Sequence, residues 1–437
     1  MRISRRQLMA SIALPLAAAG RPEWQRSHPD FTVYLPAAPG GSDNTNQHFL
    51  VTPLPNGDFL AMWTTASQES SPNQRMVCSR STDAGRTWSP PQTIDGAARG
   101  DSPGAGLASW GFPIVTPRTG RVWCFFNKNI GVQDVRAADT GVLRARWSDD
   151  GGKTWSREYH DYAIGRSALS SPDRKVPPTW IVYQKPIVTP EGAVLAGFTR
   201  WASSAADARA ASMFDRDSEL CFLRWENILS ERDPERLRVT TWPAGPHGIQ
   251  APSPDRPGIS VAQEPSVQPL ADGRLFCTMR TLTGRVWYAL SADDGRSWSE
   301  ARVLRYRPGG DPVLHPLAPC PLYRLEDGRY LLVFFNNDGG PGGPKDSKRN
   351  RTPAWYTVGR EIKDPDQPLH FGKPRILVSN DAAPLGHQSH TQIGSYPSFF
   401  EYQGKRYFWY PDRKHFLLGK LITDEMLDLA DPERYPA

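Results

Sequence analysis

Apolar strands alternate with short polar turns along the chain, and the pattern repeats. One unit has an apolar strand at residues 50–53, a turn through Asn56 and Gly57, and a second apolar strand at residues 59–63. Similar units surround five further glycines, namely Gly120, Gly192, Gly273, Gly328 and Gly404. Glycine readily adopts the positive φ that tight hairpins need, so each unit predicts a β-hairpin.

The spacing of these hairpins predicts the fold. They are separated by roughly 55 to 81 residues, about the length of a four-stranded blade and a variable loop. We therefore predict an all-β fold, a six-bladed β-propeller of four-stranded antiparallel blades over residues 30–425. A closed ring of blades also removes the exposed sheet edges that an open sheet must protect.

A second repeated motif, S-x-D-x-G-x-[TS]-W, occurs at residues 81–88, 148–155 and 291–298. Its aspartates, Asp83, Asp150 and Asp293, can accept hydrogen bonds from backbone amides of a turn. The glycine allows a positive φ, and we expect the tryptophan to pack back over its own hairpin. The motif thus predicts a structural turn, and its aspartates are not assigned to catalysis.

Composition excludes some classes of function. The chain has 437 residues, 38% hydrophobic and 22% charged, with a formal charge of +6, as in ordinary globular proteins. No run of Lys and Arg is interleaved with aromatic residues, so nucleic-acid binding gains no support. The five cysteines match no zinc-binding spacing. We expect buried free thiols, no cofactor and no metal ligands.

The N-terminus predicts export. Residues 4–9, SRRQLM, resemble a twin-arginine signal, and a short apolar stretch and three alanines follow at residues 12–19. The apolar stretch is too short to span a bilayer, and no later segment resembles a transmembrane helix. We therefore expect residues 1–20 to be a signal peptide and the mature protein to be periplasmic or secreted.

The three aspartate motifs, together with two longer stretches, resemble the sialidase (neuraminidase) superfamily, whose Asp-box or BNR repeats have this pattern. Residues 263–280, QEPSVQPLADGRLFCTMR, resemble a blade of its active site. The resemblance implies that Glu264 activates the nucleophile and that Arg280 grips the carboxylate of the substrate. Residues 394–399, GSYPSF, resemble the final blade and imply that Tyr396 is the nucleophile. A phenol suits a sugar whose anomeric carbon bears a carboxylate, because an anionic nucleophile would be repelled.

A further arginine is implied between these two blades. Arg351 is the better candidate because an apolar strand follows it, and Arg349 is the alternative. Two guanidinium groups can each bind one carboxylate through paired N–H donors, which lysine cannot do. Trp110, which opens the second blade, either lines the sugar site or packs the blade.

The first blade departs from the family pattern. Sialidases open with an R-I-P-like triplet, whereas residues 46–49 here read NQHF and place Gln47 and His48 at this point. The next loop lacks the family's acidic Asp, and Glu69 is the carboxylic acid that could protonate a leaving oxygen there. We therefore expect a standard sialic-acid substrate to be turned over poorly.

Three functional hypotheses follow. The first is an exo-acting glycoside hydrolase that releases a terminal acidic sugar from a glycan or oligosaccharide. Tyr396 attacks, Glu264 accepts its proton, and Glu69 or His48 serves the leaving oxygen. The second is a rhamnosidase or uronate lyase on the same propeller, with His48 at the centre of its mechanism. The third is a propeller that binds glycans without cleaving them. The oligomeric state is left open by the sequence.

Overall fold

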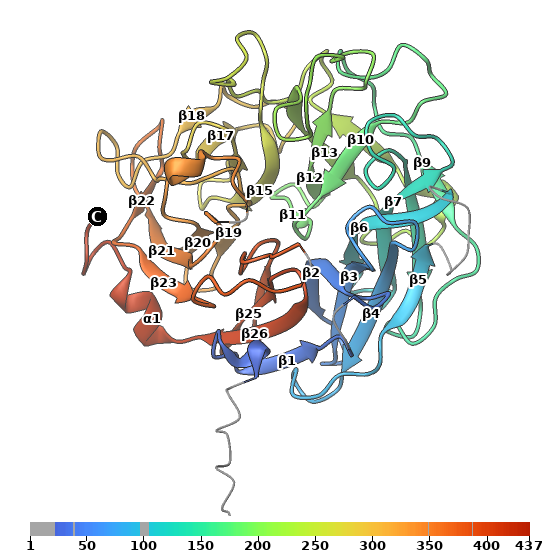
Figure 1. Ribbon diagram of the computed structural model, residues 1–437, viewed down its shortest axis with the longest axis horizontal. Helices are drawn as coiled ribbons and strands as arrows, with labels where there is room; N and C mark the ends of the chain where they lie inside the picture. Colours follow the sequence, from blue (N-terminus) through green and yellow to red (C-terminus); the bar gives the residue numbers. More distant parts are fainter. Residues whose placement is uncertain (1–21, 38–39, 97–104, 348, 387) are drawn as a thin grey trace, which may run out of the picture.

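The computed structural model describes residues 22–37, 40–96, 105–347, 349–386 and 388–437. It confirms the predicted six-bladed β-propeller: six antiparallel sheets stand around a central axis (Figure 1). The six hairpin glycines all have a positive φ, between 66° and 89°, as their turns require. The predicted signal peptide lies outside the described residues.

The first five blades follow one another along the chain. The first contains β2 (Thr45–Pro53), β3 (Phe59–Ala66), β4 (Arg75–Ser81) and β5 (Gln92–Gly96), and the second contains β6 (Ala105–Val115), β7 (Val122–Ile130), β8 (Val142–Ser148) and β9 (His160–Tyr162). The third contains β10 (Thr179–Val182), β12 (Val194–Trp201), β13 (Ser218–Trp225) and β14 (Val239–Trp242). The fourth contains β15 (Gln263–Pro269), β16 (Leu275–Arg280), β17 (Trp287–Ser291) and β18 (Arg302–Val303), and the fifth contains β19 (Leu322–Arg324), β20 (Tyr330–Phe334), β21 (Ala354–Glu361) and β22 (Leu369–Phe371). Two short strands add to this plan: β11 (Ile187–Val188) pairs with β12, and β23 (Arg375–Val378) pairs with β21.

The sixth blade closes the ring by joining both ends of the described chain. Its three inner strands are β24 (Ser398–Tyr402), β25 (Lys405–Asp412) and β26 (Phe416–Ile422). Its outermost strand is β1 (Phe31–Tyr34), which pairs antiparallel with β26 (Figure 1). A short helix, α1 (Asp424–Leu429), follows β26 and is capped by the Thr423 side chain. The described residues contain no helix that is long and apolar enough to cross a membrane.

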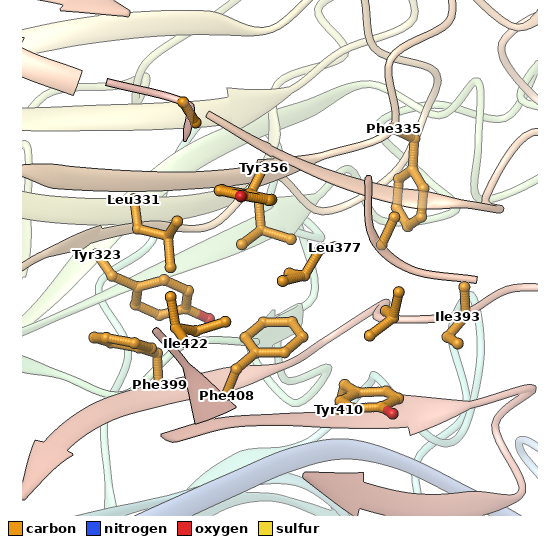
Figure 2. Packing of buried hydrophobic residues seen from close by; sticks show 14 of the residues in the cluster. Tyr323, Leu331, Phe335, Tyr356, Leu377, Ile393, Phe399, Phe408, Tyr410 and Ile422 are labelled. Atoms are coloured by element: carbon orange, nitrogen blue, oxygen red, sulfur yellow. The ribbon is translucent and has the colours of Figure 1, made fainter. Parts of the chain in front are cut away.

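The hydrophobic core is divided among the contacts between neighbouring blades. The largest cluster lies between the fifth and sixth blades, where Leu331 and Tyr356 face Phe399 and Phe408 (Figure 2). Five further clusters fill the other five contacts between blades. Each blade therefore buries both faces against its neighbours, which fixes how the blades are oriented about the axis. The five cysteines lie within these blades as buried free thiols, as predicted.

The aspartate motifs are structural turns, as predicted, and their tryptophans also contact the preceding blade. The Asp150 carboxylate accepts hydrogen bonds from the backbone amide of Thr154 at 2.9 Å and from its hydroxyl at 2.6 Å. Two of the tryptophans fold back on their own turns, where the Trp88 indole donates to the Gly85 carbonyl at 3.0 Å and the Trp298 indole donates to the Gly295 carbonyl at 3.1 Å. Trp298 of the fourth blade stacks on Phe222 of the third at 4.4 Å, and Trp88 of the first blade contacts Trp409 of the sixth. The preceding blade supplies the apolar surface, because a single hairpin has too little of its own.

The turns of the aspartate motifs lie at one end of the propeller axis, and the innermost strands begin at the opposite end. In the first blade, Pro53 at the end of β2 pairs with Phe59, and Phe59 pairs with Ser81, where the motif begins. The opposite end holds the start of β2, where Thr45 pairs with Ala66. The aspartate motifs therefore lie away from the end at which the candidate catalytic residues gather.

Candidate active site

Four of the six blades place a bulky residue with positive φ in, or just before, their innermost strand. The residues are His48, Trp110, Glu264 and Tyr396, with φ of 56°, 57°, 52° and 63°. In the first, second and fourth blades the pairing register shifts at this residue, so that two residues oppose one. Such a β-bulge redirects a side chain, and bulges are common beside active sites.

Neighbouring blades hold these bulges in place. The Glu264 amide donates to the hydroxyl of Thr199 at 2.6 Å, and the Trp110 amide donates to the hydroxyl of Thr64 at 3.0 Å. Each threonine lies on the second strand of the preceding blade. A non-glycine residue in this conformation costs about 1–3 kcal/mol, and it persists only where its surroundings impose it. Four such residues at equivalent places indicate a functional centre.

Tyr396, Glu264 and Arg280 form the centre of the site. The Tyr396 hydroxyl donates to the Glu264 carboxylate at 2.8 Å, and one Arg280 nitrogen lies 2.7 Å from the same oxygen. That nitrogen is also 3.4 Å from the Tyr396 hydroxyl. All three side chains are buried, and the other carboxylate oxygen of Glu264 has no hydrogen-bond partner among the described residues. The structure thus brings together the nucleophile, base and arginine that the resemblance implied.

The groups around Tyr396 shift its pKa in opposite directions. Burial and the Glu264 carboxylate raise the pKa of Tyr396 well above its usual value. Arg280 and Arg351 act in the opposite direction and lower that pKa. The hydroxyl therefore remains protonated in the free protein, with a carboxylate positioned to accept its proton and two cations able to stabilise a phenolate.

Arg351 is a buried cation with no acidic hydrogen-bond partner in the described part of the chain. It donates to the side chain of Gln392 at 3.3 Å and to the carbonyl of Leu317 at 2.5 Å, and its Nε has no partner among the described residues. Burial lowers its pKa. The alternative, Arg349, has 85% of its side chain exposed and pairs with Asp346 at 3.6 Å. The structure therefore places Arg351, rather than Arg349, in the site.

Glu69 lies between two cations at the solvent side of this centre. Its carboxylate oxygens lie 3.0 Å from Arg136 and 2.5 Å from Lys414, and its side chain is 23% exposed. Burial alone would raise the pKa of Glu69, but Lys414 and Arg136 outweigh it and hold that pKa well below its usual range. Glu69 is therefore ionised in the free protein and is not prepared as a proton donor.

Trp110, His48 and Gln47 occupy the adjoining part of the centre. The Trp110 indole donates to Asp139 at 2.7 Å, and its ring lies 6.3 Å from that of Tyr396 and 5.8 Å from that of His48. The two ring nitrogens of His48 and both polar atoms of Gln47 are buried without a partner among the described residues. Burial lowers the pKa of His48 to about 3, so its imidazole is neutral.

Sequence reasoning missed three charged residues of the site. Arg136 and Asp139 lie in the loop between β7 and β8 and pair with each other at 2.5 Å, and Lys414 lies in the turn between β25 and β26. The contact between Lys414 and Glu69 spans 345 positions, so no local motif contains it. One signal was available: residues 412–415 form a charged DRKH run between two largely aromatic and apolar strands.

The fold and this constellation together define a sialidase-like propeller. The chain matches the BNR repeat-like domain over residues 57–404, and it therefore belongs to the BNR repeat-like family. No curated protein matches the sequence. Among the described residues, no group of three or more His, Cys, Asp or Glu side chains is arranged to hold a metal ion.

Solved structures share the fold at low sequence identity. The Hadza microbial sialidase Hz136 is 14% identical, with a TM-score of 0.58 over 88% of this chain and 67% of that one. The intramolecular trans-sialidase from Ruminococcus gnavus is 14% identical, with a TM-score of 0.56 over 91% and 98% of the two chains. The NanB sialidase from Streptococcus pneumoniae is 12% identical, with a TM-score of 0.58 over 90% and 70%.

Proposed function

We propose that this protein is a glycoside hydrolase of the sialidase superfamily that releases a terminal acidic sugar from a glycan or oligosaccharide. The observation that carries the proposal is the hydrogen bond of 2.8 Å from the buried Tyr396 hydroxyl to Glu264, with Arg280 against both groups. A protein that only binds glycans would not need a phenol bonded to a carboxylate, with both residues held in an unfavourable backbone conformation. Neighbouring structures described as sialidases support the same class.

The pair supports a covalent mechanism with two displacements. As the Tyr396 oxygen attacks the anomeric carbon, its proton passes to Glu264 and the glycosidic C–O bond breaks. The leaving oxygen takes a proton from an acid or from water. Water then attacks the anomeric carbon and gives one proton to the conjugate base left by the first step, the bond to Tyr396 breaks, and Glu264 returns its proton to the phenolate. The sugar is released with its configuration retained, because the two displacements each invert it.

The charge of the site favours an anionic sugar. Four cationic side chains gather there, Arg136, Arg280, Arg351 and Lys414, against the acidic side chains of Glu69, Asp139 and Glu264. Burial raises the pKa of Asp139, whereas its ion pair with Arg136 acts in the opposite direction. Because Arg351 has no acidic partner among the described residues, a carboxylate on the substrate would compensate the charge of this buried cation.

We assign Glu69 a different role from that of the acid catalyst suggested by the sequence. Two cations hold it ionised, so in the free protein it organises Arg136 and Lys414 and does not offer a proton. Substrates with a good leaving group need no acid catalyst. We therefore expect aryl glycosides of the correct sugar to be cleaved faster than natural oligosaccharides.

A panel of glycans tests the proposal. The substrates end in N-acetylneuraminic acid, glucuronic acid, galacturonic acid or rhamnose, and released sugars are identified by mass. Release of a saturated acidic sugar is the expected result. Release of an unsaturated uronate or of rhamnose would replace the proposal by the second candidate below. Binding without any release would leave a glycan-binding propeller.

A second candidate rests on His48. Its imidazole is neutral, fully buried and without a hydrogen-bond partner among the described residues, and it lies beside Trp110 in the same centre. A neutral imidazole can accept a proton, as a lyase acting on a uronate requires. A histidine-centred rhamnosidase or uronate lyase therefore remains the alternative to the tyrosine mechanism.

A further inference from the structure

Lys414 is presented to the site by a turn that is bonded to two other parts of the ring. The backbone carbonyl of Lys414 accepts from the Asn46 amide at 2.6 Å, and the Arg413 amide donates to the Gln392 carbonyl at 2.7 Å. The Arg413 guanidinium is buried and paired with Asp412 at 3.0 Å. Both Arg413 and Lys414 have positive φ, 55° and 51°. The ammonium is therefore held by its backbone and does not depend on a flexible surface loop.

The ammonium lies over the aromatic ring of Tyr396. Its nitrogen lies 5.8 Å from the centroid of the Tyr396 ring, and its side chain is 10% exposed. Gln392, whose carbonyl anchors this turn, also accepts from Arg351 through its side chain at 3.3 Å. Lys414 and Arg351 thus approach the same tyrosine from connected segments, and each influences the charge state of the other.

The hydrogen-bonding capacity of this lysine is only partly used. An ammonium group has three donors. Among the described residues, the only acceptor of Lys414 Nζ is Glu69, at 2.5 Å. Two donors therefore remain for an incoming group, and the Nε of Arg351 also has no partner among these residues.

We propose that Lys414 is a specificity-determining residue whose ammonium, together with Arg351, binds the carboxylate of the acidic sugar. The inference rests on the proposed function, and it names the residue that distinguishes an acidic sugar from a neutral one. Glu69 remains bound to the ammonium and orients it, while the two free donors point to the substrate. Arg280 already bonds Glu264 and Gln263, although its Nε has no partner among the described residues, so we assign the carboxylate chiefly to Lys414 and Arg351.

The proposal predicts a dependence on pH. Burial lowers the pKa of Lys414, the positive charges of Arg351 and Arg136 lower it further, and Glu69 raises it. The other groups that face this turn or line the small cavity beside it are Tyr396, His390, Arg413 and His415. Binding of a free acid should weaken as the pH rises through the lowered pKa of the lysine. In Lys414→Arg, whose guanidinium stays protonated, this alkaline loss should disappear.

The test compares each acid with its methyl ester. Binding of N-acetylneuraminic, glucuronic and galacturonic acids and their methyl esters is measured by calorimetry for the full chain. Lys414→Met should weaken binding of the preferred acid by roughly ten- to a hundredfold. Its ester should change by less than about threefold, because the ester offers no charge to the ammonium. Lys405→Met, at an exposed lysine that begins β25, is the matched control and should alter neither.

The outcomes separate the inference from the proposed function. If the unmodified protein prefers an acid to its ester and Lys414→Met retains that preference, the inference is wrong and the proposed function stands. If the unmodified protein binds none of the three acids, both are wrong. Should Lys414→Met lose its fold, Lys414→Arg still decides: an unchanged alkaline loss of acid binding would overturn the role of Lys414.

Discussion

Tyr396 donates a hydrogen bond of 2.8 Å to Glu264, although the two residues are 132 positions apart and belong to different blades. Both have positive φ, and both lie where the innermost strand of a blade begins. The same positive-φ backbone conformation therefore directs the two side chains toward each other across the ring. His48 and Trp110 have the same conformation in the innermost strands of two further blades, so the four positions are structurally equivalent.

Removing the hydroxyl of Tyr396 should abolish catalysis without unfolding the protein. Tyr396→Phe loses one oxygen, so the blade should still pack. Turnover of the preferred sugar should fall by a factor on the order of a thousand or more, while binding of that sugar persists. The measurement is steady-state hydrolysis together with calorimetric binding. The control is Tyr410→Phe, which removes a buried hydroxyl bonded to Ser27 elsewhere in the sixth blade. Near-normal turnover by Tyr396→Phe would exclude the covalent tyrosine mechanism and favour His48.

Asp150 should contribute to stability and not to catalysis. Its carboxylate bonds the amides of Lys153 and Thr154 and the hydroxyls of Ser148 and Thr154 in a partly exposed turn. Asp150→Ala should lower the free energy of unfolding by about 1–2 kcal/mol, because turn donors lose their acceptor. Urea unfolding measures the change, and activity per folded molecule should be unaltered. Asp149→Ala, which removes surface ion pairs with Arg121 and Arg232, should cost about 1 kcal/mol or less. A folded but inactive Asp150→Ala protein would contradict the structural assignment.

His48 should make stability fall in mild acid. Burial lowers its pKa to about 3 from an ordinary value of 6.5. Between these values the unfolded chain binds a proton that the folded chain excludes, so stability falls as the pH decreases from 6.5 toward 3. The greatest slope from one such group is about 1.4 kcal/mol per pH unit. His48→Asn should flatten the curve of urea midpoint against pH in this window. The exposed His247→Asn serves as the control, and equal curves for His48→Asn and the unmodified protein would show that His48 is protonated within the fold.

Export remains a prediction of the sequence. We propose that the chain is exported through the twin-arginine route and acts in the periplasm or outside the cell. Arg5 and Arg6 supply the paired arginines of the signal, and cleavage is expected near Ala19. Replacing both arginines by lysine should trap the precursor in the cytoplasm, as fractionation and mass spectrometry would reveal. Normal export of this double variant would show that another route is used.

The repeated hairpins were sufficient to predict the ring. Each glycine turn and each aspartate motif depends on residues within a few positions of one another, so its signal survives in the sequence alone. For the same reason the family pattern located Glu264, Arg280, Arg351 and Tyr396, since each lies in a recognisable local stretch. The structure brings these four side chains into one centre, and their catalytic roles await the experiments above.

Contacts between blades could not be predicted in this way. Trp88 packs on Trp409, and Lys414 pairs with Glu69, because closing the ring places the sixth blade beside the first. The sequence suggested that Glu69 was an acid catalyst because a carboxyl group in that loop has suitable chemistry. Its protonation depends on Arg136 and Lys414, which come from two other blades.

The sequence by itself therefore determined the number of blades and their turns and predicted the candidate site residues that lie in local stretches, since these depend on local periodicity and short motifs. Tertiary structure alone decided which charges meet at the axis. Electrostatic effects on a pKa depend on distances of a few ångströms in space, and the residues that exert them here are separated by up to 345 positions in the chain. The ionised state of Glu69 and the placement of Lys414 above Tyr396 follow from that closure.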